Sequence, residues 1–82
     1  MSQPEILKTL LHVASWTFGG KCSEGDTLKA LGADSLNILE VHVELEKVLD
    51  MYIPEKEFTE WCRDLTLGEI AERVFKLEEN NQ

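Results

Sequence analysis

The stretch LGADSLNILE, residues 31–40, decides how the chain is divided, because a helix is expected to begin inside it. Asp34 has the short polar side chain that suits an N-cap, and apolar residues recur at helical spacing after it. Ser35 therefore falls in the first turn, just past the flexible Gly32-Ala33 approach. Backbone N–H groups and the helix dipole favour a negative group, such as a phosphate, at this end of a helix.

The chain on the N-terminal side of this stretch is expected to form one helix and one long loop. Ser2 and Glu5 have the spacing of a capping box, and the apolar periodicity that follows ends at Gly19-Gly20. Residues 21–33 then lack helical periodicity and contain turn-forming residues, so they are expected to form the loop.

The chain on the C-terminal side is expected to form the remaining helices. The helix that begins at Ser35 should run to about residue 50, because Pro54 cannot continue it. A short third helix is expected at residues 55–62. Thr66 and Glu69 repeat the capping-box spacing before the last helix, whose final residues, EENNQ, are expected to fray. The prediction is a single all-α domain over residues 1–82, a four-helix bundle with a long first loop and a short third helix.

Each long helix should bury one apolar face. For the second helix we expect that face to comprise Ile38, Val41, Leu45, Val48 and Leu49. For the last helix we expect Leu67, Ile70, Val74 and Leu77. The two tryptophans, Trp16 and Trp61, are expected in the core or at its edge, and lining of an acyl pocket by Trp61 is a further possibility.

Composition excludes several classes of function. A net charge of −8 over 82 residues disfavours binding to nucleic acid or to anionic membrane surfaces. The two cysteines and two histidines are not in metal-ligand spacing, so no metal site is expected. No apolar run is long enough to span a membrane and no signal-peptide pattern is present, so a cytoplasmic protein is expected. With only two distant cysteines, free thiols are expected, and the protein is also expected to be a monomer.

The second helix carries apolar residues on a face away from its core. We call Leu36, Leu39 and Val43 the second stripe. Around this stripe lie the acidic residues Glu40, Glu44, Glu46 and Asp50. Exposed leucines are ordinary on protein surfaces, but an apolar strip with an acidic rim is also typical of a docking surface for a basic partner.

Ser35 lacks the neighbours that a catalytic serine needs. His42 lies seven residues further along, two turns away on the helix axis, and no G-x-S-x-G motif is present. From the residues alone, Ser35 is either an ordinary first-turn residue or a hydroxyl that another enzyme modifies.

The segment LGADSL, followed by NILEVHVELEKVLDMYIP, resembles the acyl carrier protein family. The resemblance covers nearly the whole chain and includes the attachment motif, the acidic helix and the pair Ile53-Pro54. It implies that Ser35 receives a 4′-phosphopantetheine arm from coenzyme A, transferred by a phosphopantetheinyl transferase that typically uses Mg²⁺. The thiol of the arm would carry acyl groups as thioesters for fatty-acid, polyketide or related lipid synthesis, so the chain itself is not expected to be an enzyme.

The same resemblance implies a partner surface on the second helix. Acyl synthases, ligases and transferases with basic patches would contact Asp34, Leu36, Glu40, Val43 and Glu46. The second stripe and its acidic rim add Leu39 and Glu44 to this expected surface. Three departures from the family pattern bear on the partners: Asn37 replaces a frequent acid, Lys47 interrupts the acidic run, and His42 occupies a usually apolar position.

Two other readings stay open. A peptidyl or aminoacyl carrier would use Ser35 in the same way. An unmodified acidic helical adaptor that binds a basic partner would not need the serine. A calcium loop starting at Asp26 fails, because its third and fifth positions are Leu28 and Ala30, and a hydrolase lacks a triad.

Overall fold

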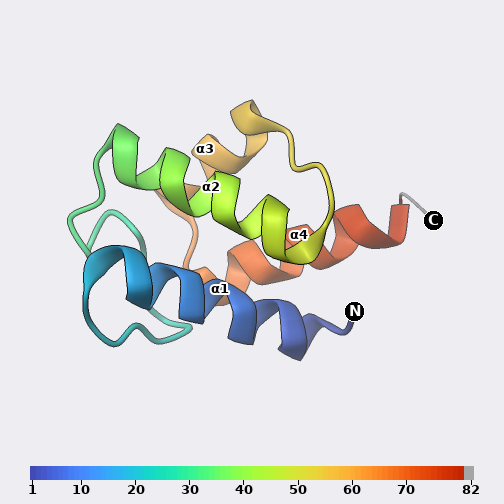
Figure 1. The fold of residues 1–82 in the computed structure, drawn as a ribbon, viewed down its shortest axis with the longest axis horizontal. Helices are drawn as coiled ribbons and strands as arrows, with labels where there is room; N and C mark the ends of the chain where they lie inside the picture. Colours follow the sequence, from blue (N-terminus) through green and yellow to red (C-terminus); the bar gives the residue numbers. More distant parts are fainter. Residues whose placement is uncertain (81–82) are drawn as a thin grey trace.

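Four helices make up the part of the chain that the computed structural model describes, residues 1–80 (Figure 1). They are α1 (Gln3–Phe18), α2 (Ser35–Leu49), α3 (Glu55–Asp64) and α4 (Leu67–Asn80). The all-α architecture, the long first loop and the short third helix are confirmed. Residues 78–80 of the tail that was expected to fray belong to α4, and residues 81–82 lie outside the described part. The α-amino group of Met1 is 2.7 Å from the carboxylate of Glu78 and helps to hold this end of α4.

Side chains close the N-terminal ends of α1 and α4 as predicted. Ser2 and Glu5 form a reciprocal capping box at α1. At α4, the Glu69 carboxylate accepts from the backbone N–H of Thr66 at 3.0 Å, and the Thr66 hydroxyl accepts from the N–H of Glu69 at 3.2 Å. The end of α1 is closed by Gly19, whose φ of +72° is readily adopted by glycine. Local sequence rules therefore account for these helix boundaries.

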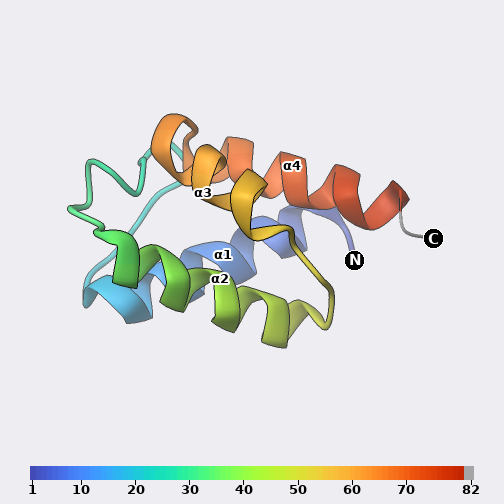
Figure 2. The same cartoon turned by 90° about the horizontal axis from the view of Figure 1, so that it is seen from above.

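α1 packs against both α2 and α4, and both run in the opposite direction to it (Figures 1 and 2). The shared core consists mainly of aliphatic side chains, with one aromatic ring from α3: Ile6, Leu10, Val13, Ala14, Leu28, Val41, Leu45, Leu49, Ile53, Phe58, Cys62, Leu67, Ile70, Ala71 and Val74. α3 is shorter and contacts α2 and α4 less extensively. It also lacks a side-chain N-cap, because Pro54 occupies that position.

Two predicted burials are wrong, and the structure buries one residue for which no burial was predicted. Val48 is 52% exposed and Trp16 is 75% exposed, whereas His42 is only 6% exposed. α3 covers the side of α2 that carries His42, so the buried face of α2 is rotated away from Val48 and towards His42. Val48 instead lines a surface pocket over α1 together with Trp16 and His12. Of the other expected core residues, Ile38 and Leu77 are half-buried at the core edge, as is Trp61.

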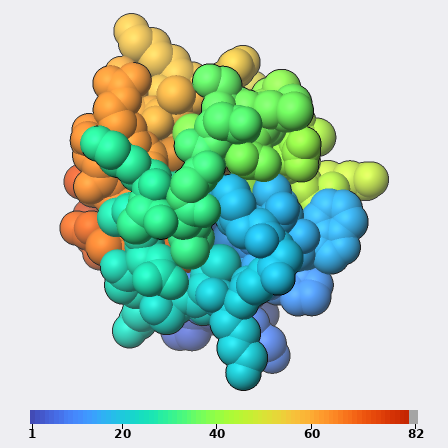
Figure 3. Space-filling model, turned by 90° about the vertical axis from the view of Figure 1, so that its left-hand side faces the viewer, coloured from blue at the N-terminus to red at the C-terminus, as the bar shows by residue number. Residues whose placement is uncertain are grey.

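The long first loop lies across the N-terminal end of α4. The N–H groups of Leu67 and Gly68 donate to the carbonyls of Asp26 and Glu24 at 2.8 and 2.9 Å. Leu28 of the loop is fully buried. The loop therefore forms part of the folded end of the bundle, beside the start of α2 (Figure 3, cyan to green).

Candidate functional site

Ser35 is the first residue of α2, and its side chain is exposed. The turn before it contains Gly32 at a φ of +84°, a conformation that glycine adopts without steric cost. Asp34 is the N-cap, as predicted, and its carboxylate accepts from the N–H of Asn37 at 2.9 Å. The Asn37 side chain in turn accepts from the N–H of Asp34 at 3.1 Å. Asn37 thus completes a capping box that fixes the turn carrying the serine.

The backbone around the hydroxyl suits an anionic group. Within the described residues, the N–H groups of Ser35 and Leu36 have no hydrogen-bond partner, as is normal for the first turn of a helix. The Ser35 hydroxyl also makes no hydrogen bond to any described residue. A phosphate attached to this hydroxyl would lie next to free donors and the positive end of the helix dipole.

Two pockets adjoin Ser35. The first, which we call the α2–α3 pocket, has a volume of about 230 Å³ and is lined by Ser35, Ile38, Leu39, His42, Glu55 and Thr59. The second, the loop-side pocket, has a volume of about 370 Å³ and is lined by Lys29, Ala33, Asp34, Ser35, Ile38, Thr59, Cys62 and Arg63. Two cationic side chains, Lys29 and Arg63, therefore flank the serine on the loop side of a strongly acidic protein.

His42 is committed to structure and not to Ser35. Its Nε2 lies 2.7 Å from the carbonyl oxygen of Ile53, to which it donates. Its ring stacks on Phe58, with centroids 4.9 Å apart and an interplanar angle of 23°. Glu46 supports the same tie, because its carboxylate accepts from the N–H of Ile53 at 2.7 Å. His42 thus joins α2 to the segment that leads into α3.

The second stripe is exposed, as expected for a face of α2 that points away from the core. Leu36, Leu39 and Val43 are 61, 45 and 52% exposed. Glu40 is exposed beside them and Glu44 is half-exposed. Two of the predicted partner residues also have internal roles: Asp34 caps α2, and Glu46 holds Ile53. The structure therefore presents three aliphatic side chains with free carboxylates around them on the exposed face of α2.

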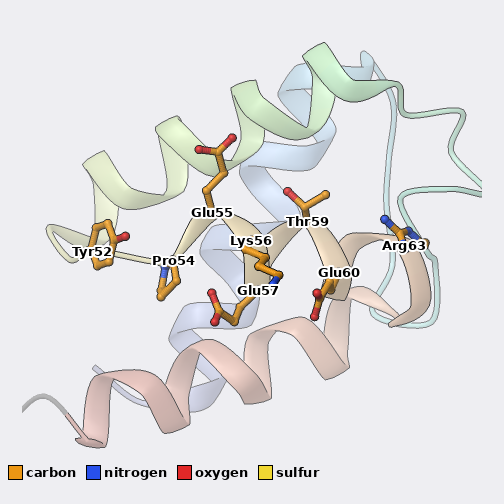
Figure 4. A pocket seen from close by; sticks show the side chains of 8 residues that line it. All are labelled: Tyr52, Pro54, Glu55, Lys56, Glu57, Thr59, Glu60 and Arg63. Carbon is orange, nitrogen blue, oxygen red and sulfur yellow. The ribbon is translucent and has the colours of Figure 1, made fainter.

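Several other features do not include Ser35. A shallow groove of about 630 Å³ follows the outer face of α3 (Figure 4). Trp61 lines neither of the pockets at Ser35. Its ring instead packs edge-on against Phe58, with the ring centroids 6.3 Å apart. Cys22 and Cys62 are both free, and burial raises the pKa of the Cys62 thiol to about 12. Over residues 1–80 no group of three or more His, Cys, Asp and Glu side chains could hold a metal ion. No helix in this part of the chain is long and apolar enough to cross a membrane.

Sequence reasoning found Ser35, Asp34 and the second stripe, but missed the lining of the two pockets. Lys29, Glu55, Thr59 and Arg63 come from the first loop and from α3, and only the packing of α3 beside α2 brings them to Ser35. The one available signal was His42, a polar residue on an otherwise apolar face.

Comparison of the chain with protein-family models, with curated proteins and with solved structures gives no match. Its function is therefore argued from its own residues.

Proposed function

We propose that the chain is a carrier protein whose Ser35 bears a 4′-phosphopantetheine arm. The observation that carries this proposal is the placement of an exposed hydroxyl at the first residue of α2, between two pockets and beside free N–H groups. A modifying enzyme can approach such a hydroxyl from solvent. The phosphodiester it becomes gains donors from the helix start and cations from the loop-side pocket.

The loading reaction would be a phosphoryl transfer from coenzyme A. The Ser35 oxygen attacks the phosphorus that bears pantetheine, a new P–O bond forms, and the bond to the adjacent phosphate breaks. Adenosine 3′,5′-bisphosphate leaves, and the hydroxyl proton passes to the transferase. Ser35 has no hydrogen-bonded base among the described residues, so the activating groups would come from a separate enzyme. The arm supplies the thiol that forms thioesters.

The partner enzymes would be transferases, synthases or ligases that dock on the exposed face of α2. The second stripe supplies apolar contact, and Glu40 and Glu44 attract basic patches. The internal bond of Glu46 to Ile53 makes its share in docking smaller than that of Glu40. A monomeric carrier in the cytoplasm fits this role, because it must meet several enzymes in turn.

Loading can be tested directly by intact-mass spectrometry. Incubation with coenzyme A and a broad-specificity transferase should add the mass of one phosphopantetheine. Ser35→Ala should stay unmodified, and Ser23→Ala, which alters a serine in the first loop, should load normally. A protein that stays bare with a transferase active on a control carrier refutes the proposal. Full biological activity of Ser35→Ala would favour an adaptor that needs no arm.

A further inference from the structure

Trp16 is the most exposed of the large apolar side chains in the described part of the chain. It is 75% exposed near the C-terminal end of α1, and among residues 1–80 its ring packs on no other aromatic ring. Tryptophan has a large apolar surface, and it is enriched at the centres of protein–protein interfaces. The packing of the bundle therefore does not account for a tryptophan at this position.

A shallow groove lies beside Trp16, where α1 and α2 pack in antiparallel directions (Figures 1 and 2). It consists of two adjoining hollows of about 250 and 470 Å³, which share His12 and Val48. We call it the α1–α2 groove; residues between Lys8 and Trp16 line it on α1, and Glu44 and Val48 line it on α2. Because a helix rises about 1.5 Å per residue, the groove follows α1 for about 12 Å, or roughly two turns.

The groove is separate from the surface that a carrier function would use. None of its lining residues belongs to the second stripe or to either pocket at Ser35. On α2, Val48 is five residues from Val43, which places the two side chains about 140° apart around the helix axis. A molecule seated in the groove therefore leaves Ser35 and the second stripe open.

Opposite charges mark the two ends of the groove. Glu44 lies at the end beside Trp16, and Lys8 lies about two turns away at the other end. Neither side chain forms an ion pair with another residue of the range 1–80. An α-helix has a positive N-terminal end and a negative C-terminal end, so it complements these charges when its N-terminus lies at Glu44.

The charge of the whole chain also bears on the occupant. A net charge of −8 argues against a second copy of the chain, because two copies repel each other. A basic partner is attracted by the same field. A groove of roughly two turns accommodates apolar side chains at positions i, i+4 and i+7 of a helix, which is how amphipathic helices bind in grooves.

We propose that the α1–α2 groove binds an amphipathic helix of a basic partner protein, which packs its apolar side chains on Trp16 and Val48. The N-terminal turn of this helix lies at Glu44 and its C-terminal turn at Lys8, so it runs parallel to α2. The partner holds the protein in an assembly and leaves the Ser35 hydroxyl accessible to other enzymes. This inference goes beyond the proposed function and does not depend on an arm at Ser35.

The test uses two synthetic peptides of about sixteen residues, each stapled into a helix and free of aromatic residues. Both carry leucines at positions i, i+4 and i+7. One has lysines in its first turn and a glutamate in its last, and the other has these charges exchanged, so their general attraction to an acidic protein is equal. In Trp61→Phe, Trp16 is the only tryptophan. The first peptide should move its emission to shorter wavelength in a saturable way, and should bind about fivefold more tightly than the second.

Variants assign the binding to the groove, with affinity measured by the fluorescence anisotropy of a labelled peptide. Trp16→Ala should weaken binding at least about tenfold, because truncation of a central aromatic anchor removes much of the binding energy. Tyr52→Ala is the matched control, since Tyr52 is 73% exposed and lies outside the groove, and it should bind as the unaltered protein does. Glu44→Gln should reduce the preference for the first peptide.

Several results would overturn the proposal. They are the absence of a saturable emission change with either peptide, equal affinity for the two peptides, and an affinity that Trp16→Ala leaves unchanged or that Tyr52→Ala lowers equally. A dimer in sedimentation that Trp16→Ala dissociates would make a second copy the occupant instead. Ser35→Ala should bind the first peptide normally, so a failure of this proposal is distinct from a failure of loading.

Discussion

Replacement of His42 by alanine is expected to lower the free energy of unfolding by about 3 kcal/mol. The Ile53 carbonyl, on a residue that is 0% exposed, would lose its partner at 2.7 Å, and an orphaned buried carbonyl costs about 1–3 kcal/mol. Loss of the stacking on Phe58 adds about 0.5–1.5 kcal/mol, and the void left by the ring adds more.

The assay is urea unfolding followed by circular dichroism, with thermal unfolding as a second measurement. For a domain of this size, 3 kcal/mol corresponds to a decrease in Tm of roughly 12–24 °C. His42→Phe keeps an aromatic ring next to Phe58 but cannot donate to Ile53, so it should cost about 2 kcal/mol. Val43→Ala, an exposed neighbour on α2, should cost no more than about 0.5 kcal/mol. If His42→Ala destabilises the protein no more than Val43→Ala does, the tie between α2 and Ile53 is not structural and the reasoning is refuted.

Three further predictions concern local features. Gly32→Ala should lower the free energy of unfolding by about 1 kcal/mol, measured by urea unfolding, because φ is +84° there; an unchanged midpoint would contradict this. At neutral pH, a chromogenic disulfide reagent should label Cys22 and spare the buried Cys62 until urea is added. The reason is that burial raises the pKa of the Cys62 thiol to about 12, so almost no reactive thiolate is present. Rapid labelling of both cysteines in the folded protein would contradict this. Hydrogen bonds from Thr66 lower the pKa of Glu69 below its ordinary value of 4.5. The ionised carboxylate therefore stabilises the fold above pH 4.5, and this stabilisation is lost as the pH falls through the lowered pKa. Glu69→Gln should flatten the acid side of a stability–pH curve, and an unaltered curve would contradict this.

Local rules made the helix boundaries predictable. Capping boxes at Ser2 and Thr66, and the glycine at position 19, act within a few residues of the chain, and the structure follows them. The start of α2 was predictable for the same reason, because Asp34 caps its own helix. The position of Ser35 in the candidate site follows from this boundary alone.

The buried side of α2 was less predictable, because it depends on where the other helices lie. Val41 and Leu45 are buried under any packing of this helix, but Val48 and His42 lie on opposite borders of the face. The placement of α3 buries His42 and leaves Val48 exposed beside α1. For the same reason, no sequence spacing could bring Glu55 and Thr59 to Ser35.

His42 connects the stability of the fold with the shape of the candidate site. Its Nε2 holds Ile53, and with it the entry to α3, and the residue also lines the pocket beside Ser35. An aliphatic residue at this position could fill the core but would leave the Ile53 carbonyl without its partner. α3 has no side-chain N-cap and packs least extensively, so this bond has a large share in fixing where Glu55 and Thr59 lie. A substitution at His42 should therefore lower the stability of the bundle and loosen the position of α3 beside Ser35, whereas a substitution at the exposed Glu55 should change the stability little.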